Sequence, residues 1–358
     1  MISFIIKKVI YGTLVLWGVL TVVFFLFNVL PGDPARMMLD KREDSNQLVV
    51  IKHKYGFDRS VPEQYLLYLN DVSPISFHYH HQDAFTTLEK RKYTYTELLP
   101  MSNSSFVLKV PYLRESFVRT GSSVTSIISE TFKNTFILAI TSIGVALIFG
   151  LLLGVFSALY KDTFLDKLIL FISVLGMSLP SFFASIIIAW LFGFLLHSYT
   201  GLSMTGSLFE VDDYGSGSFL QLQNLILPAI TLGIRPLSVI IQLCRNSFLE
   251  VLSMDYVRTA TAKGLSKFTV IFKHALRNAL NPVVTAVSSW FASLLAGAVF
   301  VEYIFAWNGI GKEIVDALNK MDLPVIMGSV LFIASIFVFI NIIVDLIYGW
   351  LDPRIRIQ

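Results

Sequence analysis

Residues 135–160 read TFILAITSIGVALIFGLLLGVFSALY, and none of these 26 residues carries a charge. A helix needs about 20 consecutive, mostly apolar residues to cross a bilayer. A segment this long and apolar can satisfy its backbone hydrogen bonds in lipid only as a helix. We therefore predict a transmembrane helix at these residues.

Five further stretches meet the same criterion: residues 9–30, 168–196, 225–243, 282–301 and 324–350. The first is too long for the apolar core of a signal peptide and precedes no small-x-small cleavage site, so we expect it to be retained. Pro180 and Pro236 are predicted to kink the third and fourth spans, and Arg235 also interrupts the fourth. The sequence thus predicts six spans.

The overall composition agrees with a polytopic membrane protein. Of the 358 residues 54% are apolar and 15% are charged, and the mean hydropathy is +0.67. Soluble domains contain about 45–50% apolar and about 25% charged residues. A soluble enzyme and a disordered chain are thereby excluded, and the single cysteine, Cys244, excludes a disulfide scaffold. The net charge of +3 is too small to indicate a nucleic-acid partner.

The distribution of lysine and arginine predicts the orientation. An even number of spans places both termini on one side. If that side is the cytoplasm, the inner segments contain twelve basic residues and the two short outer loops contain only Lys312 and Lys320. Because short inner loops are enriched in Lys and Arg, both termini are predicted to be cytoplasmic.

Three regions follow from these spans. Residues 1–30 form the first helix, residues 31–133 an outer cap, and residues 134–358 the membrane core with a cytoplasmic loop at 245–278. Within the cap, residues 51–68 suggest two short helices split near residues 58–62. Residues 78–111 are rich in Tyr, Thr and Ser and favour strands and loops.

The cytoplasmic loop contains the pattern of a short helix. Asp255 is placed to cap a helix over residues 256–263, Lys263 would complement the dipole of its last turn, and Gly264 fits the position after its C-cap. Eight helical residues span only about 12 Å. Isolated helices shorter than about 12–15 residues are marginal in water, so this helix needs a surface to dock against.

A second helix is expected to begin after Ser266 as its cap. An apolar stripe is formed by Phe268, Ile271, Phe272, Ala275 and Leu276, and the residues off the stripe include Lys267, Lys273, His274 and Arg277. This pattern is typical of a basic amphipathic helix at the inner membrane surface.

The sequence shows no known catalytic motif. It contains no H-E-x-x-H, no paired C-x-x-C and no G-x-S-x-G. The nearest approach to a phosphate-binding loop, Gly309-Ile-Gly311-Lys312, has Ala306 and Glu313 where a P-loop needs Gly and Ser or Thr. Energy for any transport must therefore come from a gradient or from a partner.

Several blocks of sequence together resemble the oligopeptide/dipeptide/nickel permeases of binding-protein-dependent ABC importers. YVRTATAKGL at residues 256–265 and HALRNALNP at 274–282 resemble the cytoplasmic "EAA" loop of that family. The other matching blocks are PGDP at 31–34, KYGFD at 54–58, PEQY at 62–65, VEYIFAWNGIG at 301–311, NIIVD at 341–345 with Tyr348, and DPRIR at 352–356. These blocks cover most of the chain in the family's order, and the resemblance is to the B-type permease, the partner with the larger segment after its first helix.

The resemblance implies an all-α permease with six helices of the ABC type I importer class, in a bacterial inner membrane. It implies a homologous C-type permease, two ABC ATPases and an extracytoplasmic binding protein as partners, with ATP and Mg bound by the ATPases and no cofactor in this chain. Peptides are the implied cargo, and nickel–chelator complexes or other small solutes are the alternative.

In this family the short cytoplasmic helix couples the permease to an ATPase. The resemblance assigns that role to Asp255, Tyr256, Arg258, Thr259, Ala260, Ala262, Lys263, Gly264 and Leu265. Ala260 and Ala262 would allow close approach, Arg258 and Lys263 would pair with acidic groups, and Gly264 would form the turn. Two departures are evident: Arg258-Thr-Ala260 replaces the EAA triplet, and residues 73–112 form an insertion where the family has a Gly-Asp-Leu-Gly stretch.

Several residues keep two interpretations. With Pro180 and Asn341, Arg235 is a candidate for the substrate path, because an intramembrane charge is a functional hypothesis by default; alternatively it snorkels or pairs with a loop acid such as Asp212. Asp345 is either a proton relay or, as we favour, a structural partner of a neighbouring helix.

His78, His80 and His81 would either bind a metal or, as we favour, belong to a polar loop surface. Small residues recur every four positions at Ala146, Gly150, Gly154 and Ala158, and again at Ser289, Ser293 and Gly297. They indicate close helix packing, within the chain or against another subunit. A gradient-driven transporter using Arg235 and Asp345, and a receptor sensing through residues 31–133, are the two competing classes of function.

Overall fold

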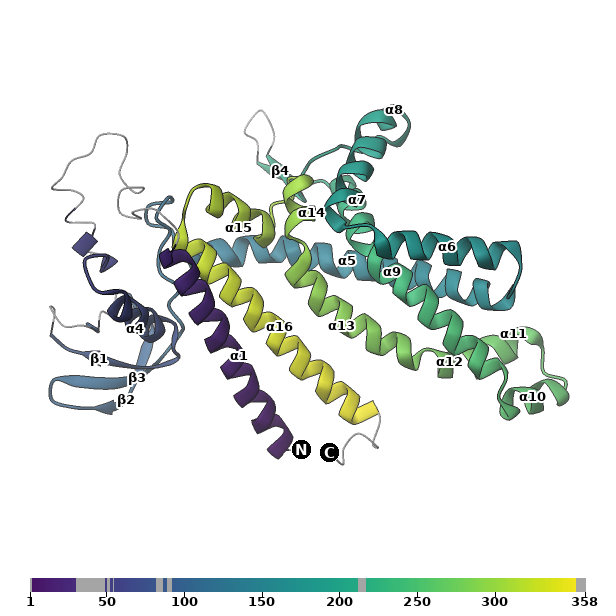
Figure 1. Ribbon diagram of the computed structural model, residues 1–358, viewed down its shortest axis with the longest axis horizontal. Helices are drawn as coiled ribbons and strands as arrows, with labels where there is room; N and C mark the ends of the chain where they lie inside the picture. Colours follow the sequence, from purple (N-terminus) through teal and green to yellow (C-terminus); the bar gives the residue numbers. More distant parts are fainter. Residues whose placement is uncertain are drawn as a thin grey trace. The chain divides into compact units, whose positions relative to one another are not determined.

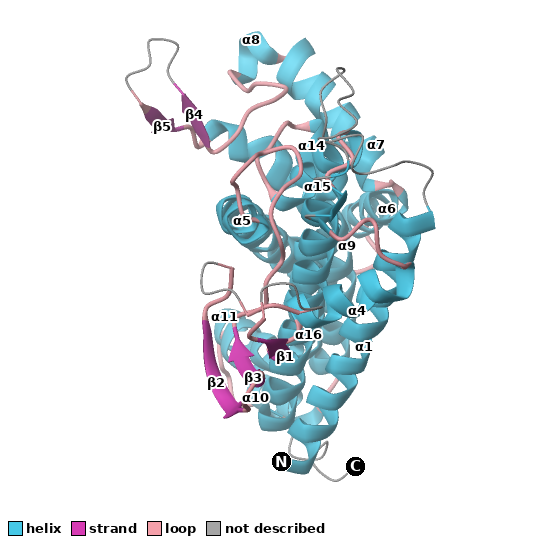
Figure 2. Cartoon of the chain, turned by 90° about the vertical axis from the view of Figure 1, so that its left-hand side faces the viewer, coloured by secondary structure: helices cyan, strands magenta, loops and turns pink. Residues whose placement is uncertain are grey.

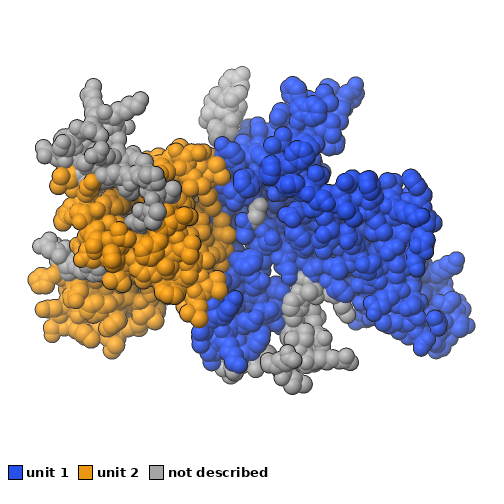
Figure 3. All heavy atoms as spheres, in the orientation of Figure 1, with its two compact units in different colours: residues 1–12, 131–313, 335–358 blue, residues 13–130, 314–334 orange. Residues whose placement is uncertain are grey.

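The computed structural model describes residues 2–29, 49, 52–53, 55–81, 86–88, 92–211 and 217–351 (Figure 1). The described residues are mostly helical, with short strands in two places (Figure 2). The chain divides into two compact units, coloured in Figure 3. Unit 1 comprises Met1–Gly12, Thr131–Glu313 and Ser335–Gln358, and unit 2 comprises Thr13–Glu130 and Ile314–Ala334.

Four of the six predicted spans are continuous helices. Among the described residues, the helices long and apolar enough to cross a membrane unaided are α1 (Ile2–Val29), α5 (Val124–Leu159), α9 (Gln223–Leu252) and α16 (Leu323–Leu351). Helix α9 continues through Pro228 and Pro236, so Pro236 does not interrupt the fourth span. Helix α5 begins at Val124, eleven residues before the apolar stretch that predicted it.

The third predicted span is broken rather than kinked. Helix α6 (Phe164–Ser178) and helix α7 (Ser181–Ile188), continued by the π-helical segment η1 (Ala189–Leu195), meet at 110°. Leu179 is extended at the break and Pro180 is the N-cap of α7, because proline disfavours helical geometry at the residue before it. We expected one helix bent at Pro180; the structure instead has two separate helices that meet at this residue.

The fifth predicted span lies in a second bent pair. Helices α11 (Lys267–Thr269), η2 (Val270–Ala275) and α12 (Leu276–Ala279) lead into α13 (Asn281–Gly297), with a bend of 47° between the two halves. Helix α14 (Val299–Ile304) and helix α15 (Ile310–Asn319) follow. If each bent pair counts as one span, the described residues supply six.

Close contact of small residues holds α5, α6 and α9 of unit 1 together. A Cβ atom added at Gly150 would collide with Ile240, and one at Gly154 would collide with Cys244. Cys244 is buried beside Ala146 in the same cluster. The first small-residue stripe thus packs within the chain, whereas Ser289 and Ser293 of the second stripe are not buried. Between η1 and α9, this unit also contains helix α8 (His197–Thr200) and the hairpin of β4 (Phe209–Val211) with β5 (Ser218–Leu220).

Unit 2 contains a small antiparallel sheet beside helix α4 (Val61–Val72). The strands are β1 (Ile75–Tyr79), β2 (Tyr95–Pro100) and β3 (Ser104–Lys109), in the order β1-β3-β2. The strands predicted for residues 78–111 are thus present. The second of the two predicted short helices is α4. In the first, residues 52, 53 and 55 are helical, and residues 51 and 54 lie outside the described residues.

Aromatic packing forms the core of unit 2. Phe24 of α1 contacts Tyr65 and Tyr68 of α4, and Met327 and Leu331 of α16 join the same buried cluster. The Glu63 carboxylate accepts hydrogen bonds from the backbone N–H and hydroxyl of Ser60, which fixes the start of α4.

Candidate functional site

The short helix predicted after residue 255 is present as α10 (Asp255–Ala262). Met254 is its N-cap and Lys263 its C-cap, so Asp255 is the first helical residue and not the predicted cap. The Asp255 carboxylate lies 3.6 Å from the guanidinium of Arg258, and both side chains are largely exposed. An acidic residue in the first turn still complements the helix dipole.

The helix ends in a Schellman motif, as the glycine predicted. The Leu265 N–H donates to the Ala260 carbonyl at 3.4 Å and the Gly264 N–H donates to the Thr261 carbonyl at 3.0 Å. Gly264 has φ +78°, and a Cβ atom added there would meet no heavy atom within 4 Å among the described residues. Glycine is therefore needed for its backbone conformation and not for space.

One face of α10 packs against its own chain. Val257 and Ala260 are buried in an apolar cluster, which we call the coupling cluster. Its other members are Ala158 of α5, Phe248 and Val251 of α9, Val270 and Ala275 of η2, and Ala279 of α12. The predicted role of Ala260 in approaching a partner is therefore corrected: its small side chain allows α10 to approach its own helices.

The opposite face of α10 is open. All the remaining predicted coupling residues are exposed: Asp255, Tyr256, Arg258, Thr259, Ala262, Lys263, Gly264 and Leu265. The Tyr256 hydroxyl also accepts a hydrogen bond of 2.7 Å from Asn278 Nδ2, which ties α10 to α12. The exposed face is basic at Arg258 and Lys263. Exposed apolar side chains lie at the two ends of the helix: Met254 and Tyr256 at its start and Leu265 after its end.

The segment after Gly264 departs from the predicted amphipathic helix. Ser266 caps it as expected, accepting a bond from the Thr269 N–H. The π-helical turn η2 then changes the angular spacing of side chains, because a π turn contains more residues than an α turn. Val270, Ala275 and Ala279 are buried, whereas Phe268 and Phe272 of the predicted stripe are exposed, with their rings 4.4 Å apart.

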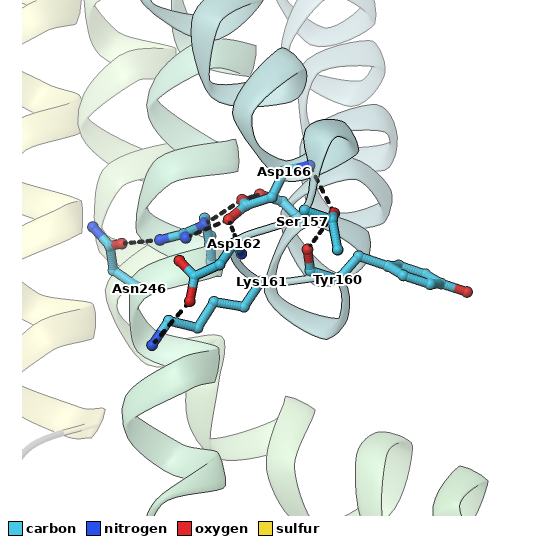
Figure 4. Close-up of polar contacts among 8 residues, drawn as sticks. Ser157, Tyr160, Lys161, Asp162, Asp166 and Asn246 are labelled. Carbon is cyan, nitrogen blue, oxygen red and sulfur yellow. Dashed lines mark hydrogen bonds and ion pairs between the residues drawn. The ribbon is translucent and has the colours of Figure 1, made fainter.

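An ion pair that sequence reasoning missed lies at the same end of these helices. The Asp166 carboxylate on α6 accepts two hydrogen bonds of 2.7 Å from Nε and Nη2 of Arg245 on α9 (Figure 4). It also accepts bonds from the Ser157 hydroxyl on α5 and, at 2.9 Å, from the Asp162 backbone N–H. The sequence offered one signal for this pair: Asp166 and Arg245 carry opposite charges at the predicted inner ends of two spans.

The block VEYIFAWNGIG proves to have a structural role. The buried carboxylate of Glu302 accepts bonds of 2.7 Å from the Thr135 hydroxyl and from the Gly311 N–H, at the start of α15. The buried Trp307 donates its indole N–H to the Asn134 carbonyl at 3.1 Å. The carboxylate fills the space in which a phosphate loop would need an open anion site, so the block fastens α14 and α15 to α5.

The candidate path residues lie on three separate helices. Arg235 of α9 is exposed in this chain, with its guanidinium carbon 6.0 Å from the Trp290 ring centroid of α13; Asp212 lies outside the described residues. Pro180 is exposed at the break before α7. The Asn341 amide donates to the Phe337 carbonyl of its own helix. These contacts bring none of the three side chains together.

Asp345 and the three histidines have different surroundings. Asp345 of α16 pairs with Lys8 of α1 at 2.6 Å, which is the structural role that we favour. His78 lies in β1 and is buried, with its ring centroid 4.9 Å from that of Tyr93 and the ring planes 58° apart, so the predicted polar loop surface is wrong for this residue. His80 and His81 are exposed. In the part of the chain that the structure describes, no group of three His, Cys, Asp or Glu side chains is placed to hold a metal ion.

The chain is similar to known proteins along nearly its full length. Residues 150–357 match the family described as "Binding-protein-dependent transport system inner membrane component", and residues 1–83 match the N-terminal component of the same systems. The di/tripeptide transport system permease protein DppB of Pseudomonas aeruginosa (strain UCBPP-PA14) is 34% identical over 377 residues, covering 100% of both chains.

Two further relatives are similar over nearly their whole length. The dipeptide transport system permease protein DppB of Bacillus subtilis (strain 168) is 32% identical, covering 94% of this chain and 92% of its own. The glutathione transport system permease protein GsiC of Salmonella typhimurium is 31% identical, covering 99% of both. This chain is therefore a multi-pass transport component and not an enzyme, and it belongs to the family of binding-protein-dependent transport system inner membrane components.

Proposed function

We propose that this chain is the B-type transmembrane subunit of an ATP-driven importer that moves di- and oligopeptides across a bacterial inner membrane. The full-length likeness to permeases named for di/tripeptide, dipeptide and glutathione transport carries the choice of cargo. The chain needs an external source of energy, since no ATP-binding loop occurs in its sequence. Two ABC ATPases that bind ATP and Mg supply it.

The open face of α10 is the docking surface for an ATPase. Arg258 and Lys263 offer two positive charges to acidic groups of the partner, and Gly264 turns the chain away at the end of the helix. Tyr256, Thr259, Ala262 and Leu265 complete the exposed surface. Because Val257 and Ala260 pack into the coupling cluster, a push on α10 is transmitted directly to α5 and α9.

The remaining partners and the orientation follow from the same proposal. Both termini and the 245–278 loop lie in the cytoplasm, and residues 31–133 form the cap that meets an extracytoplasmic binding protein. A homologous C-type permease covers the open side of α13, where Ser289 and Ser293 permit close approach. Substrate passes between the two permeases, past Pro180, Arg235 and Asn341, with Arg235 attracting the peptide carboxylate.

The proposal is tested by purification and uptake together. The tagged chain, extracted in mild detergent from its native membrane, should carry a sister permease and two ATPases, and the reconstituted complex should import a dipeptide only with ATP. Arg258→Ala should reduce ATP-driven uptake by about tenfold or more, the scale of one lost interface anchor. Lys320→Ala removes an exposed charge on the predicted outer side and should have no effect.

Two results would overturn the proposal: recovery of the chain without any ATPase, and uptake that follows an ion gradient instead of ATP. A gradient-driven mechanism would also require Asp345 to exchange protons, although this carboxylate is paired with Lys8 at 2.6 Å. Competition between the dipeptide and a nickel–chelator complex distinguishes the two classes of cargo.

A further inference from the structure

The ion pair of Asp166 and Arg245 joins three helices at one carboxylate. Both carboxylate oxygens are used twice: Oδ1 accepts from Ser157 and from Arg245 Nε, and Oδ2 accepts from Arg245 Nη2 and from the Asp162 N–H. A carboxylate has about four acceptor sites, so this one is fully occupied. The Asp166 side chain is 2% exposed and that of Arg245 is 14% exposed.

This geometry is more restrictive than an ordinary ion pair. Two parallel N–H···O bonds between a planar guanidinium and a carboxylate fix orientation as well as distance. A second ion pair in the same unit, Lys8 with Asp345, is 2.6 Å long, but its side chains are 38% and 32% exposed. Such half-exposed lysine pairs restrict the relative position of two helices far less.

Arg245 lies about two helical turns before the end of α9, next to the coupling cluster. Phe248 and Val251, on those last turns, are buried against Val257 and Ala260 of α10. A displacement of α10 therefore reaches the segment of α9 that carries Arg245. The hydrogen bonds of the Arg245 guanidinium to Asp166, near the start of α6, transmit this displacement to α6.

Helices α6 and α9 are also in contact farther along their length. A Cβ atom added at Gly176 of α6 would collide with the Ser238 hydroxyl of α9, and the two helices pack along one another. Two fixed points hold α6 to α9, one at each end of α6. Helix α6 leads directly into the 110° break and α7.

We propose that Asp166 and Arg245 are a positioning pair that makes the broken third span follow the coupling helix during the ATPase cycle. This inference rests on the proposed function. The pair touches neither substrate nor ATPase; it converts a push on α10 into a movement of α6 and α7. Without it, ATP hydrolysis continues while the broken span lags behind.

The test uses the complete reconstituted importer and the ratio of dipeptide imported to ATP hydrolysed. The main variant is the double substitution Asp166→Asn with Arg245→Gln, because removing both charges avoids leaving one buried charge unpaired. Asp345→Asn is the matched control, since it breaks a second ion pair between two helices of the same unit, Lys8 with Asp345. Thermal unfolding and recovery of both ATPases with the tagged chain establish that each variant assembles.

We expect the double variant to keep ATP hydrolysis while the ratio falls roughly tenfold, within the usual range of coupling between sites. Asp345→Asn should keep the wild-type ratio. An unchanged ratio in the assembled double variant would overturn the inference, and so would an equal fall in Asp345→Asn. If no ATPase is recovered with the tagged wild-type chain, the proposed function itself is overturned. This result is distinct from a failure of the inference, in which the ATPases are recovered and the ratio is unchanged.

A distance measurement covers the case in which the double variant does not assemble. Spin labels at Lys161→Cys and Thr261→Cys report on the α5–α6 turn and on the last turn of α10; both positions are exposed and outside the docking surface, and the native Cys244 is buried. In the otherwise unchanged complex, we expect the label distance to be the same with and without trapped ATP. A distance that changes on trapping would show that the two ends move independently and would overturn the inference. Ser157→Ala, which removes one bond to Asp166, should broaden the distribution.

Discussion

Helix α10 and the sheet of unit 2 are attached to their surroundings by opposite means. The attachment of α10 consists of small apolar side chains, Val257 and Ala260, in the coupling cluster. The sheet is attached to α4 through Asp71 of that helix and three residues in the segments that flank β2 and β3. The Asp71 carboxylate accepts hydrogen bonds from the Tyr93 hydroxyl at 2.6 Å and from Arg114 Nε at 2.9 Å. Lys92 Nζ lies 3.4 Å from the same carboxylate.

This difference matters because apolar contacts are non-directional, whereas charged hydrogen bonds fix angles. A helix held by apolar contacts can shift slightly on its surface without breaking a hydrogen bond. A sheet held by buried charges keeps one arrangement, but its stability depends on the protonation of its members. The comparison predicts different responses to substitution and to pH in the two regions.

The largest effect is expected from Asp71→Asn. Burial opposes the ionisation of Asp71, but the charges of Arg114 and Lys92 hold its pKa below the usual value. Removing the carboxylate leaves two cations without their partner, which costs about 3–5 kcal/mol for a buried pair. Hydrogen exchange in the purified chain should show loss of protection across β1 and β3, and unchanged protection in α10.

The control for this change is Asp58→Asn, which removes the partner of His53 in an exposed pair. Exposed pairs contribute little, so protection of β1 and β3 should stay at the wild-type level. Equal loss in both variants would mean that Asp71 does not hold the sheet.

The next effect is a loss of sheet stability in acid. Burial, with the nearby charge of Lys109, lowers the pKa of His78 from 6.5 to about 4. The unfolded chain therefore takes up a proton at a higher pH than the folded chain. Stability is complete above pH 6.5 and falls between pH 6.5 and 4, by at most about 3 kcal/mol.

Hydrogen-exchange protection factors at pH 7 and pH 5 measure this effect in the full chain. His78→Gln should abolish the difference between the two pH values, whereas His80→Gln, on an exposed site, should leave it intact. Protection in α10 should be independent of pH over this range, and a matching loss there would contradict the comparison.

A smaller effect is expected when the apolar attachment of α10 is overfilled. Ala260→Leu forces a larger side chain into the coupling cluster and should cost about 1–3 kcal/mol. Ala262→Leu places the same side chain on the exposed face and should leave protection of α10 unchanged. If the two variants behave alike in the isolated chain, the assignment of the two faces is wrong.

The smallest expected effect concerns backbone conformation alone. Gly264→Ala places a Cβ atom at φ +78° and should destabilise the end of α10 by about 1–2 kcal/mol. Gly144→Ala is its counterpart inside α5, where an added Cβ also meets no heavy atom within 4 Å among the described residues. Alanine is favoured over glycine in a helix interior, so thermal unfolding should shift in opposite directions.

The sequence predicted those features of the fold that a single segment determines by itself. Apolar runs identified the long helices, because length and hydropathy are local properties, and Gly264 and Ser266 marked the ends of their helices through backbone conformation and capping. The orientation of Ala260 was missed, since it depends on which face of α10 meets α9. The pair of Asp166 and Arg245 was also missed, because 79 residues separate the partners and only the packing of α6 on α9 brings them together.

The two bent spans show a second limit of prediction from the sequence. Pro180 indicated a disturbance, but a proline alone does not specify the angle of 110°, and both α6 and α7 also pack on α9. The strands of the cap were foreseen from composition, whereas the order β1-β3-β2 was not. Strand order depends on contacts between segments, which residue patterns within one strand do not record.

The π-helical turn η2 has a consequence for chain length. A π turn holds one residue more than the α-helical ladder around it, and each residue advances an α-helix by about 100°. Deleting a single residue within Val270–Ala275 would therefore restore an unbroken ladder instead of disrupting it. A deletion between Val270 and Ala275 would place the buried residues Val270, Ala275 and Ala279 four positions apart, the spacing at which an α-helix presents side chains on one face. This part of the chain is therefore where the loss of one residue would be absorbed locally, without rotating the segments on either side.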